Sequence, residues 1–443
     1  MQYSSSSSQV LTPESVALFA KVTKRFMPLL ISLFLVAFLD RVNLGFAALT
    51  MNADLGISPY VYGWGAGIFF IGYFFFEVPS NLALARFGAR VWIARIMITW
   101  GLISAATAFV RGPASFLVLR FLLGLAEAGF SPGITLFLTY WYPARERARI
   151  LAIFYLAIPL ANIIGAPISS LLLNLNGFGG LHGWQWLFII EGLPAVVLAF
   201  VALGYLTNRP EEASWLSPDD RKTLSEIMKA DESLSERAHG RLTLREVFTD
   251  PRVLLLGLVY IPITMGLYGL GFWLPQIVKG FGVSNLTVGL LATIPFLFAA
   301  VVQVYWCRHS DVTGERRWHF ALPCLLIAGG FTMSALSPWH YVSFLGIIFS
   351  TIGVMCAQPT FWTMPSAMLT GAAAAGGLAI INSIGNLGGF FGPYVVGWVA
   401  ETTKNPATGL IVLACTLLMA AGSALALHPE AVGERSRKSS AAR

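Results

Sequence analysis

The feature that most constrains this chain is a series of twelve apolar runs, each long enough to cross a lipid bilayer as a helix. A bilayer core takes about 20 consecutive apolar residues per helix. Only 12% of the 443 residues are charged, whereas a soluble protein carries about 25%. The runs fall at 26–48, 61–84, 92–110, 115–141, 150–173, 184–206, 253–279, 286–306, 318–337, 340–366, 376–400 and 408–428. They predict an all-α polytopic membrane protein with twelve transmembrane helices, and they exclude a nucleic-acid binder, a disulfide scaffold and a disordered chain.

One long connection, 208–252, divides six runs from six. It holds ten acidic and eight basic residues, so we expect an exposed cytoplasmic linker. The turns after the second and eighth runs share a Gly-x-Arg core, which indicates two six-helix pseudo-repeats around a cavity at the membrane midplane. The expected order is an N-terminal cytoplasmic tail, a six-helix bundle, the linker, a second six-helix bundle and a C-terminal cytoplasmic tail, at 1–25, 26–207, 208–252, 253–428 and 429–443.

The basic residues are distributed unevenly between alternate connections. Of 29 Lys and Arg, 23 fall in one set of connections or at the two ends of the chain. The other set holds only Arg111, Lys279 and Lys404. Because basic connections stay in the cytoplasm, this asymmetry predicts a multi-pass protein of a bacterial inner membrane with both termini cytoplasmic.

Enzyme chemistry has no support in the sequence. It contains no GxSxG, Walker or HExxH motif, and its four cysteines stand singly in apolar stretches. We therefore expect no enzyme, no metal site, no cofactor and no ATP-driven step. A gradient-driven carrier, a channel or a receptor remains.

Several charged residues lie inside the apolar runs, where each costs about 2.5–3.5 kcal/mol. The first run contains Asp40, Arg41 and Asn43, and the fourth contains Arg120 and Glu127, which share a helix face about 10 Å apart. These residues predict a central site in which arginines hold an anion and the carboxyls hold a transferable proton. A desolvated carboxyl favours its neutral form and a nearby arginine favours its ionised form, so an anion that competes for the arginine would promote proton uptake. The alternative is a set of static ion pairs between helices.

Other candidates are polar or aromatic residues near the same depth. Tyr73 and Glu77 share a face of the second run, although Glu77 could be merely interfacial. In the second half we expect Asn382, Asn386 and Trp273 to contact a ligand.

Candidate gate residues lie in the cytoplasmic turns. A carboxylate there can pair with arginines in one state and release them in another; the alternative is ordinary positive-inside topology. The candidates are Asp311, Arg316, Arg317 and Arg90.

Four segments resemble the anion:cation symporter family of the major facilitator superfamily, whose members include tartrate, sugar-acid and aromatic-acid permeases. They are LDRVNL at 39–44, RFLLGLAEAGFSPG at 120–133, WYP at 141–143 and INSIGNLGG at 381–389. The resemblance covers about residues 26–428. It implies proton-coupled uptake of a carboxylate, with proton-linked carboxyls at Asp40 and Glu127, arginines at Arg41 and Arg120, and pocket contacts near Tyr73 and Asn382.

The sequence departs from the family pattern in two places. Ala85 precedes Arg86 where the superfamily usually carries Asp, which weakens a gate in the first half. The fifth run has Ala166-Pro167 without the Gly-Pro and Gly-Gly pattern of many drug exporters.

The leading hypothesis is therefore a monomeric symporter whose partners are a small organic anion, protons and the bilayer. A drug or metabolite exporter of the same fold and a membrane sensor are its rivals. Two arginines with asparagines favour a hydroxy acid such as tartrate or a sugar acid, while the aromatic residues suit an aromatic acid.

Overall fold

The computed structural model describes residues 13–238, 250–368 and 372–427, and the described part is helical throughout its regular structure. The expected C-terminal tail, the first twelve residues and 239–249 of the linker lie outside the described residues. The first half contains α1 (Pro13–Asp54), α2 (Pro59–Phe87), α3 (Ala89–Ala106), α4 (Pro113–Glu127), α5 (Phe130–Thr139), α6 (Ala144–Tyr155), α7 (Ala157–Leu172) and α8 (Gly183–Tyr205). After the connecting α9 (Pro218–Ala238) come α11 (Pro251–Lys279), α12 (Asn285–Thr313), α13 (Arg317–Leu336), α14 (His340–Met368), α15 (Ala372–Asn386), α16 (Gly388–Thr403) and α17 (Pro406–Ala426). Short 3-10 turns are η1 (Thr107–Phe109), η2 (Leu173–Leu175), η3 (Phe178–Gly180) and η4 (Pro210–Glu212).

The predicted all-α membrane fold is confirmed. Eleven of the predicted runs appear among the described residues as helical spans long and apolar enough to cross a membrane. The remaining run, 376–400, consists of α15 and α16, which meet at Leu387 and are each too short to count as a span alone. Residues 13–25, expected as part of a tail, form the first turns of α1.

Local sequence explains where the helices start and where one is interrupted. Proline, which needs no intrahelical N–H partner, occupies the first turn of α2, α4, α11 and α17. Ser58 caps α2 by accepting from the N–H of Val61 at 3.3 Å. The fourth span breaks directly after Glu127, where Gly129 has φ +85°, a left-handed conformation that glycine tolerates best. The break therefore places Glu127 at the last position of α4, inside the fourth span.

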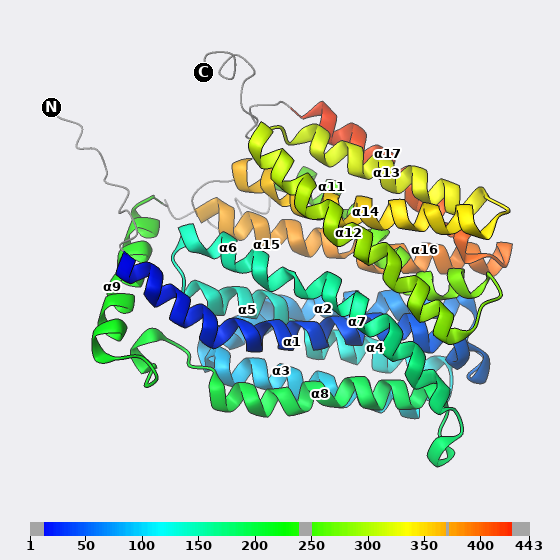
Figure 1. Ribbon diagram of the computed structural model, residues 1–443, viewed down its shortest axis with the longest axis horizontal. Helices are drawn as coiled ribbons and strands as arrows, with labels where there is room; N and C mark the ends of the chain where they lie inside the picture. Colours follow the sequence, from blue (N-terminus) through cyan, green and yellow to red (C-terminus); the bar gives the residue numbers. More distant parts are fainter. Residues whose placement is uncertain (1–12, 239–249, 369–371, 428–443) are drawn as a thin grey trace.

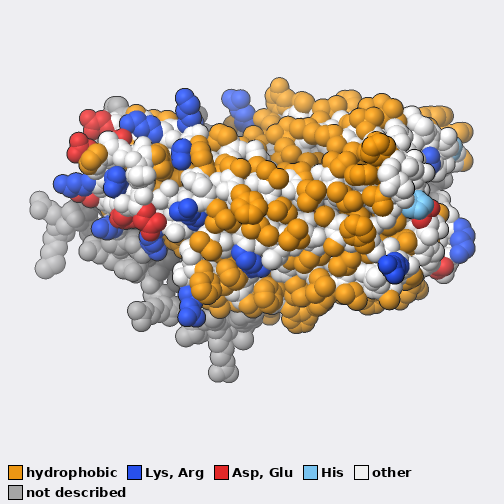
Figure 2. Space-filling model, turned by 90° about the horizontal axis from the view of Figure 1, so that it is seen from below, with side chains coloured by type: hydrophobic (Ala, Val, Ile, Leu, Met, Phe, Trp, Pro, Cys, Tyr) orange, Lys and Arg blue, Asp and Glu red, His pale blue; other side chains and the backbone are white. Residues whose placement is uncertain are grey.

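The helices run roughly parallel along the long axis of the molecule (Figure 1). We call α1–α8 the N-half and α11–α17 the C-half. Each half packs mainly within itself, and the halves meet where α1 contacts α11, α2 contacts α16, and α7 contacts α12. The helix α9 crosses one end of the bundle, which we call the α9 end (Figure 1). In Figure 2 apolar side chains cover the middle of the visible face and charged side chains gather at the α9 end, as expected for a protein surrounded by lipid.

The two halves approach most closely away from the α9 end. A Cβ on Gly63 of α2 would lie 2.6 Å from the carbonyl oxygen of Pro393 of α16, so these helices touch backbone to backbone. Tyr62 of α2 donates from its hydroxyl to the carbonyl of Phe272 of α11 at 2.8 Å, and its ring packs on Trp273 with centroids 4.9 Å apart. Within the C-half, Trp273 donates from Nε1 to the carbonyl of Pro393 at 3.2 Å. Tight packing therefore closes this opposite end between the halves.

Candidate functional site

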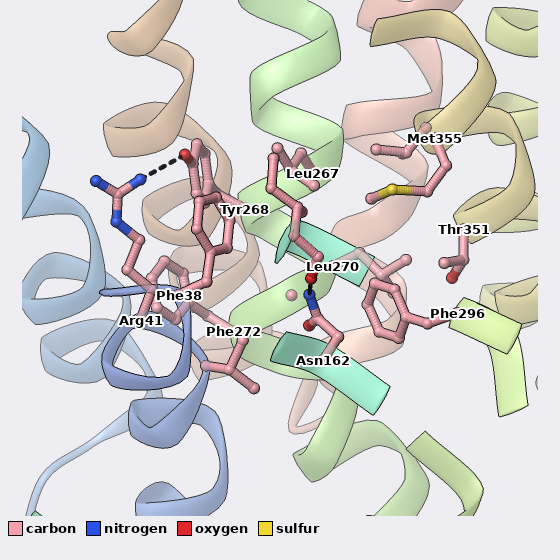
Figure 3. Close-up of a pocket in the computed structure, with 14 residues that line it drawn as sticks. Phe38, Arg41, Asn162, Leu267, Tyr268, Leu270, Phe272, Phe296, Thr351 and Met355 are labelled. Carbon is pink, nitrogen blue, oxygen red and sulfur yellow. Dashed lines mark hydrogen bonds between the residues drawn. The ribbon is translucent and has the colours of Figure 1, made fainter. Parts of the chain in front are cut away.

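A cavity of about 50 Å³ lies where α1, α7, α11, α12 and α14 meet, about halfway along the bundle. Figure 3 shows Arg41 at one side of it and Asn162, Tyr268 and Thr351 as its other polar groups. The rest of the lining is aromatic or aliphatic: Phe38, Val42, Ile158, Leu267, Leu270, Gly271, Phe272, Phe296, Val354 and Met355. Arg41 thus brings a positive charge to a largely apolar chamber shared by both halves.

Arg41 is held by one residue from each half. Its Nε donates to Glu127 Oε1 at 2.9 Å, its Nη2 donates to the same oxygen, and its Nη1 donates to the hydroxyl of Tyr268 at 3.1 Å. The Glu127 side chain is 1% exposed and the Arg41 side chain 15% exposed. Glu127 Oε2 is buried without a hydrogen-bond partner among the described residues. The guanidinium also lies 5.3–5.7 Å from ring centroids, a range that cation–π attraction covers: Phe38, Phe69 and Tyr73. Arg41, Glu127 and Tyr73 are therefore brought together, with Tyr73 buried behind the arginine.

Asp40 and Asn43 lie on the other side of α1, away from the cavity lining. Asn43 Nδ2 donates to Asp40 Oδ1 at 3.1 Å, and the hydroxyl of Ser104 on α3 donates to the same oxygen. Both residues are buried, at 2% and 0% exposure. The successive residues Asp40 and Arg41 point in different directions because neighbours on a helix lie about 100° apart. The first span therefore carries two separate polar sites.

Arg120 is fully enclosed within the N-half and does not line the cavity. Its Nε donates to the carbonyl of Gly65 at 3.1 Å, and its guanidinium lies 5.2 Å from the ring centroid of Phe69. It interacts electrostatically with Asp40 and Glu127. Its charge acts on both carboxyls without a direct hydrogen bond to either.

Glu77 joins the two halves near the same depth. Its oxygens accept from Asn382 Nδ2 at 3.4 Å and from the Ser383 hydroxyl at 3.1 Å, both on α15. Asn386 lies one turn further along α15 and is half-buried. Trp273 is buried between the halves against Tyr62, with ring centroids 4.9 Å apart. Thus Asn382 faces Glu77, and Trp273 packs beside the cavity without lining it.

The candidate gate residues lie at the α9 end: Asp311 in the last turn of α12, Arg316 in the connection that follows, and Arg317 and Arg90 in the first turns of α13 and α3. Arg316 donates to Asp311 Oδ1 at 2.8 Å and also to the Ser310 hydroxyl at 2.8 Å. Arg317 donates to the last carbonyls of the C-half, those of Leu425 and Leu427. On the N-half, Arg90 donates from Nε to the carbonyl of Leu203. Each arginine contacts its own half.

Sequence reasoning missed several polar residues of this region, among them Asn162, Thr351, Ser383 and Ser104. Asn162 lies in the middle of α7, lines the cavity and donates from Nδ2 to the carbonyl of Ile158 at 3.0 Å. An amide inside an apolar run is the same signal that singled out Asn382, so it could have been found. Ser104 gave no signal, because serines are common in membrane helices.

Comparisons with known proteins agree with this architecture. The family model of the Major Facilitator Superfamily matches residues 29–393 and 256–443. A protein of Agrobacterium vitis described as "Putative tartrate transporter" is 52% identical over 401 residues, with 90% of this chain and 92% of the relative covered. A "Quinolone resistance transporter" of Acinetobacter baumannii is 44% identical, with 90% and 92% covered. The crystal structure of a bacterial homologue of the human lysosomal transporter Spinster superposes with a TM-score of 0.73 at 17% identity, covering 94% of this chain and 97% of that one. The chain therefore belongs to the major facilitator superfamily and is a multi-pass membrane transporter, not an enzyme.

Proposed function

We propose that this protein carries a small organic carboxylate into the cell together with protons, across a bacterial inner membrane with α9 and both termini on the cytoplasmic side. The observation that carries the proposal is Arg41, a charged residue that lines a cavity between the halves and whose partners are Glu127 and Tyr268. An organic anion needs such a guanidinium, because charge-assisted hydrogen bonds to carboxylates are the strong ones.

Coupling follows from competition for that guanidinium. In the resting site, Glu127 occupies Nε and Nη2 of Arg41. When Glu127 binds a proton it becomes a weaker acceptor, and Arg41 is released for the carboxylate of the substrate. The anion and the proton therefore enter together. The proton alone would leave Arg41 without a charged partner, and the anion alone would leave Glu127 ionised without its arginine. We place a second proton at Asp40, under the influence of Arg120.

Alternating access then requires the halves to separate at one end and close at the other. The contacts of α2 with α16 close the opposite end. At the α9 end, the Asp311–Arg316 pair and the bonds of Arg317 and Arg90 stabilise turns within each half. We propose that these residues act as a gate that rearranges when that end closes.

The cavity supports a hydroxy acid as the substrate class. Its polar lining, Asn162, Tyr268 and Thr351, offers donors and acceptors that suit hydroxyl groups. The name of the relative that is 52% identical points to tartrate for that protein. A sugar acid has the same chemistry, whereas an aromatic acid would rely on Phe38, Phe272 and Phe296 instead.

Uptake by proteoliposomes tests the proposal. The purified protein is reconstituted and given radiolabelled tartrate with and without an inward proton gradient, in competition with unlabelled sugar acids and aromatic acids. We expect accumulation only with the gradient, and competition first by hydroxy acids. Arg41→Ala abolishes binding, and normal affinity in that variant would remove Arg41 from the site. Gradient-independent uptake by the wild type would reject the coupling.

A second candidate, export of drugs or metabolites, is supported by the 44% identity to the quinolone resistance transporter. The mostly apolar cavity lining also suits a planar drug. Inside-out membrane vesicles separate the two directions, because an exporter accumulates a labelled quinolone in them when the vesicle interior is acidified. Symport predicts no such accumulation.

A further inference from the structure

The interior of the N-half carries more carboxyl groups than guanidinium groups. Among the described residues of the N-half, four carboxyl groups are buried, against two guanidinium groups that are buried or nearly so. They are Asp40, Glu77, Glu127 and Glu191, and Arg41 and Arg120. Glu127 is paired with Arg41, Asp40 lies in the field of Arg120, and Glu77 accepts from two neutral donors. Glu191 remains, and no described cation lies within 4 Å of it.

Glu191 lies on α8 where that helix packs against α1, α3 and α7. It is 5% exposed, and its Oε1 accepts from the hydroxyl of Ser169 on α7 at 2.7 Å. Its Oε2 is buried and has no hydrogen-bond partner among the described residues. A carboxylate that is buried without a cation is strongly destabilising, so this side chain needs a proton.

Asn43 and Ser104 place Glu191 beside Asp40. Asn43 Nδ2 donates to Asp40 Oδ1 at 3.1 Å, and the Ser104 hydroxyl donates to the same oxygen. Ser104 also packs against the residue that follows Glu191, because a Cβ on Gly192 would lie 3.2 Å from the Ser104 Cβ. Glu191 interacts electrostatically with both Asp40 and Asn43. Asp40 Oδ2 and Asn43 Oδ1 are, like Glu191 Oε2, buried acceptors without a donor in the described structure. An unsatisfied buried acceptor destabilises the fold. A proton on either carboxyl supplies the donor that this group of acceptors lacks.

We propose that Asp40 and Glu191 share one proton across Asn43, so that the second proton site of this transporter is a carboxyl pair rather than Asp40 alone. The inference deepens the proposed function and rests on it for its role in transport. Two neighbouring carboxyls do not ionise together, because the second negative charge is repelled by the first, and they therefore titrate as a pair. Glu191 does not contact the substrate: it affects transport by changing how readily Asp40 binds its proton, and it is therefore a positioning residue.

The charged groups around the pair come from few elements. The helix α1 contributes Asp40 and Arg41, and α4 contributes Arg120, which interacts with Asp40. The contacts from α7 and α3 are the hydroxyls of Ser169 and Ser104. Arg95 on α3 is nine residues from Ser104, about 13 Å along the helix, and is half-buried. Glu127, also on α4, interacts with Asp40 as well. Among the described residues the proton of the pair is therefore governed by Arg120, by Glu127 and by mutual repulsion.

Infrared difference spectroscopy tests the shared proton without any transport. The C=O stretch of a protonated carboxyl is recorded at neutral pH for the wild type, Glu191→Gln, Asp40→Asn and the control Glu211→Gln, whose side chain is exposed. We expect the acid band to shift in Glu191→Gln and in Asp40→Asn, because each variant removes one of the two carboxyls that share the proton, and to stay unchanged in the control. A band that is unchanged in Glu191→Gln, or that changes only in Asp40→Asn, would overturn the proposal. If Glu191→Gln does not fold, Ser169→Ala replaces it: loss of the hydroxyl donor shifts the acid band when Glu191 shares the proton and leaves it in place otherwise.

The pH profile of uptake is the second measurement. Without its neighbouring carboxyl, Asp40 in Glu191→Gln binds a proton less readily, and half-maximal uptake needs about tenfold more protons. Glu191→Asp restores the wild-type profile, which a loss of packing alone would not explain. An unchanged profile in Glu191→Gln also contradicts the inference. If uptake by the wild type proves independent of protons, the proposed function fails while the infrared result still decides whether the proton is shared.

Discussion

Replacing Glu127 by glutamine tests the coupling between proton and anion most directly. In the wild type, Nε and Nη2 of Arg41 both donate to Glu127 Oε1, and Glu127 Oε2 has no described partner. A substrate carboxylate must displace this contact. Glutamine has nearly the same shape and can still accept at Oε1, but it carries no charge, so the variant resembles the protonated wild type at every pH.

The size of the effect follows from the hydrogen bonds involved. A hydrogen bond to a charged group contributes about 1.5–3 kcal/mol, against about 0.5–1.5 kcal/mol for a neutral one. The competing acceptor is therefore weakened by about 1–2 kcal/mol, which corresponds to about 5- to 30-fold tighter anion binding. The gain is largest at alkaline pH, where wild-type Glu127 is ionised, and it disappears at acidic pH, where the wild type is protonated.

Binding and transport are then measured separately. We expect Glu127→Gln to bind the labelled acid with little dependence on pH and to exchange it across the membrane, but not to accumulate it on a proton gradient. Glu77→Gln is the control, since Glu77 accepts from Asn382 and Ser383 and leaves the Arg41 contact intact. Undiminished accumulation by Glu127→Gln, or an affinity as dependent on pH as that of the wild type, would refute the coupling role.

Three further predictions concern the edges of the site and the ends of the bundle. Tyr268→Phe removes a 3.1 Å hydrogen bond to the cavity guanidinium worth about 0.5–1.5 kcal/mol, so the KM for uptake should rise about two- to tenfold; an unchanged KM would show that the bond does not orient the site. Gly63→Ala places a methyl group 2.6 Å from a carbonyl oxygen of α16 and should slow uptake strongly, whereas Gly422→Ala, which faces open space, should not; equal rates would disprove closure by this contact. Lys21 donates to Asp220 at 2.8 Å and lowers the pKa of that carboxyl, so the pair stabilises the fold above the ordinary aspartate pKa of about 3.9 and loses that contribution as the pH falls through the lowered value. Because both groups are partly exposed, Lys21→Ala should lower the free energy of unfolding at neutral pH by under about 1 kcal/mol. A larger decrease, measured by thermal unfolding, would show that the pair contributes more than a surface ion pair does.

Much of the architecture is readable from the amino-acid sequence because a bilayer imposes a simple rule. Every backbone N–H and C=O inside the hydrocarbon must be bonded within its own segment, so an apolar run of sufficient length becomes a helix. The rule was less informative at 376–400, where the run divides into α15 and α16 at Leu387. Length and composition cannot show such a break.

The identities of the charged residues were also accessible from the sequence, since an ionisable group in a membrane helix is expensive and stands out. That is how Asp40, Arg41, Arg120 and Glu127 were singled out. Their partners were not accessible. The sequence does not show that Arg41 contacts Glu127 and Tyr268 while Arg120 bonds the carbonyl of Gly65.

The sequence by itself determined that this chain crosses a membrane repeatedly and which of its residues pay an electrostatic penalty for being there. Only the tertiary structure decided which of those residues meet: that one arginine reaches a chamber and another is enclosed, and that Ser104, which donates to Asp40, packs against the residue next to Glu191. The physical reason is that hydropathy is a property of each segment alone, whereas pairing depends on the rotation and depth at which separate helices pack against one another.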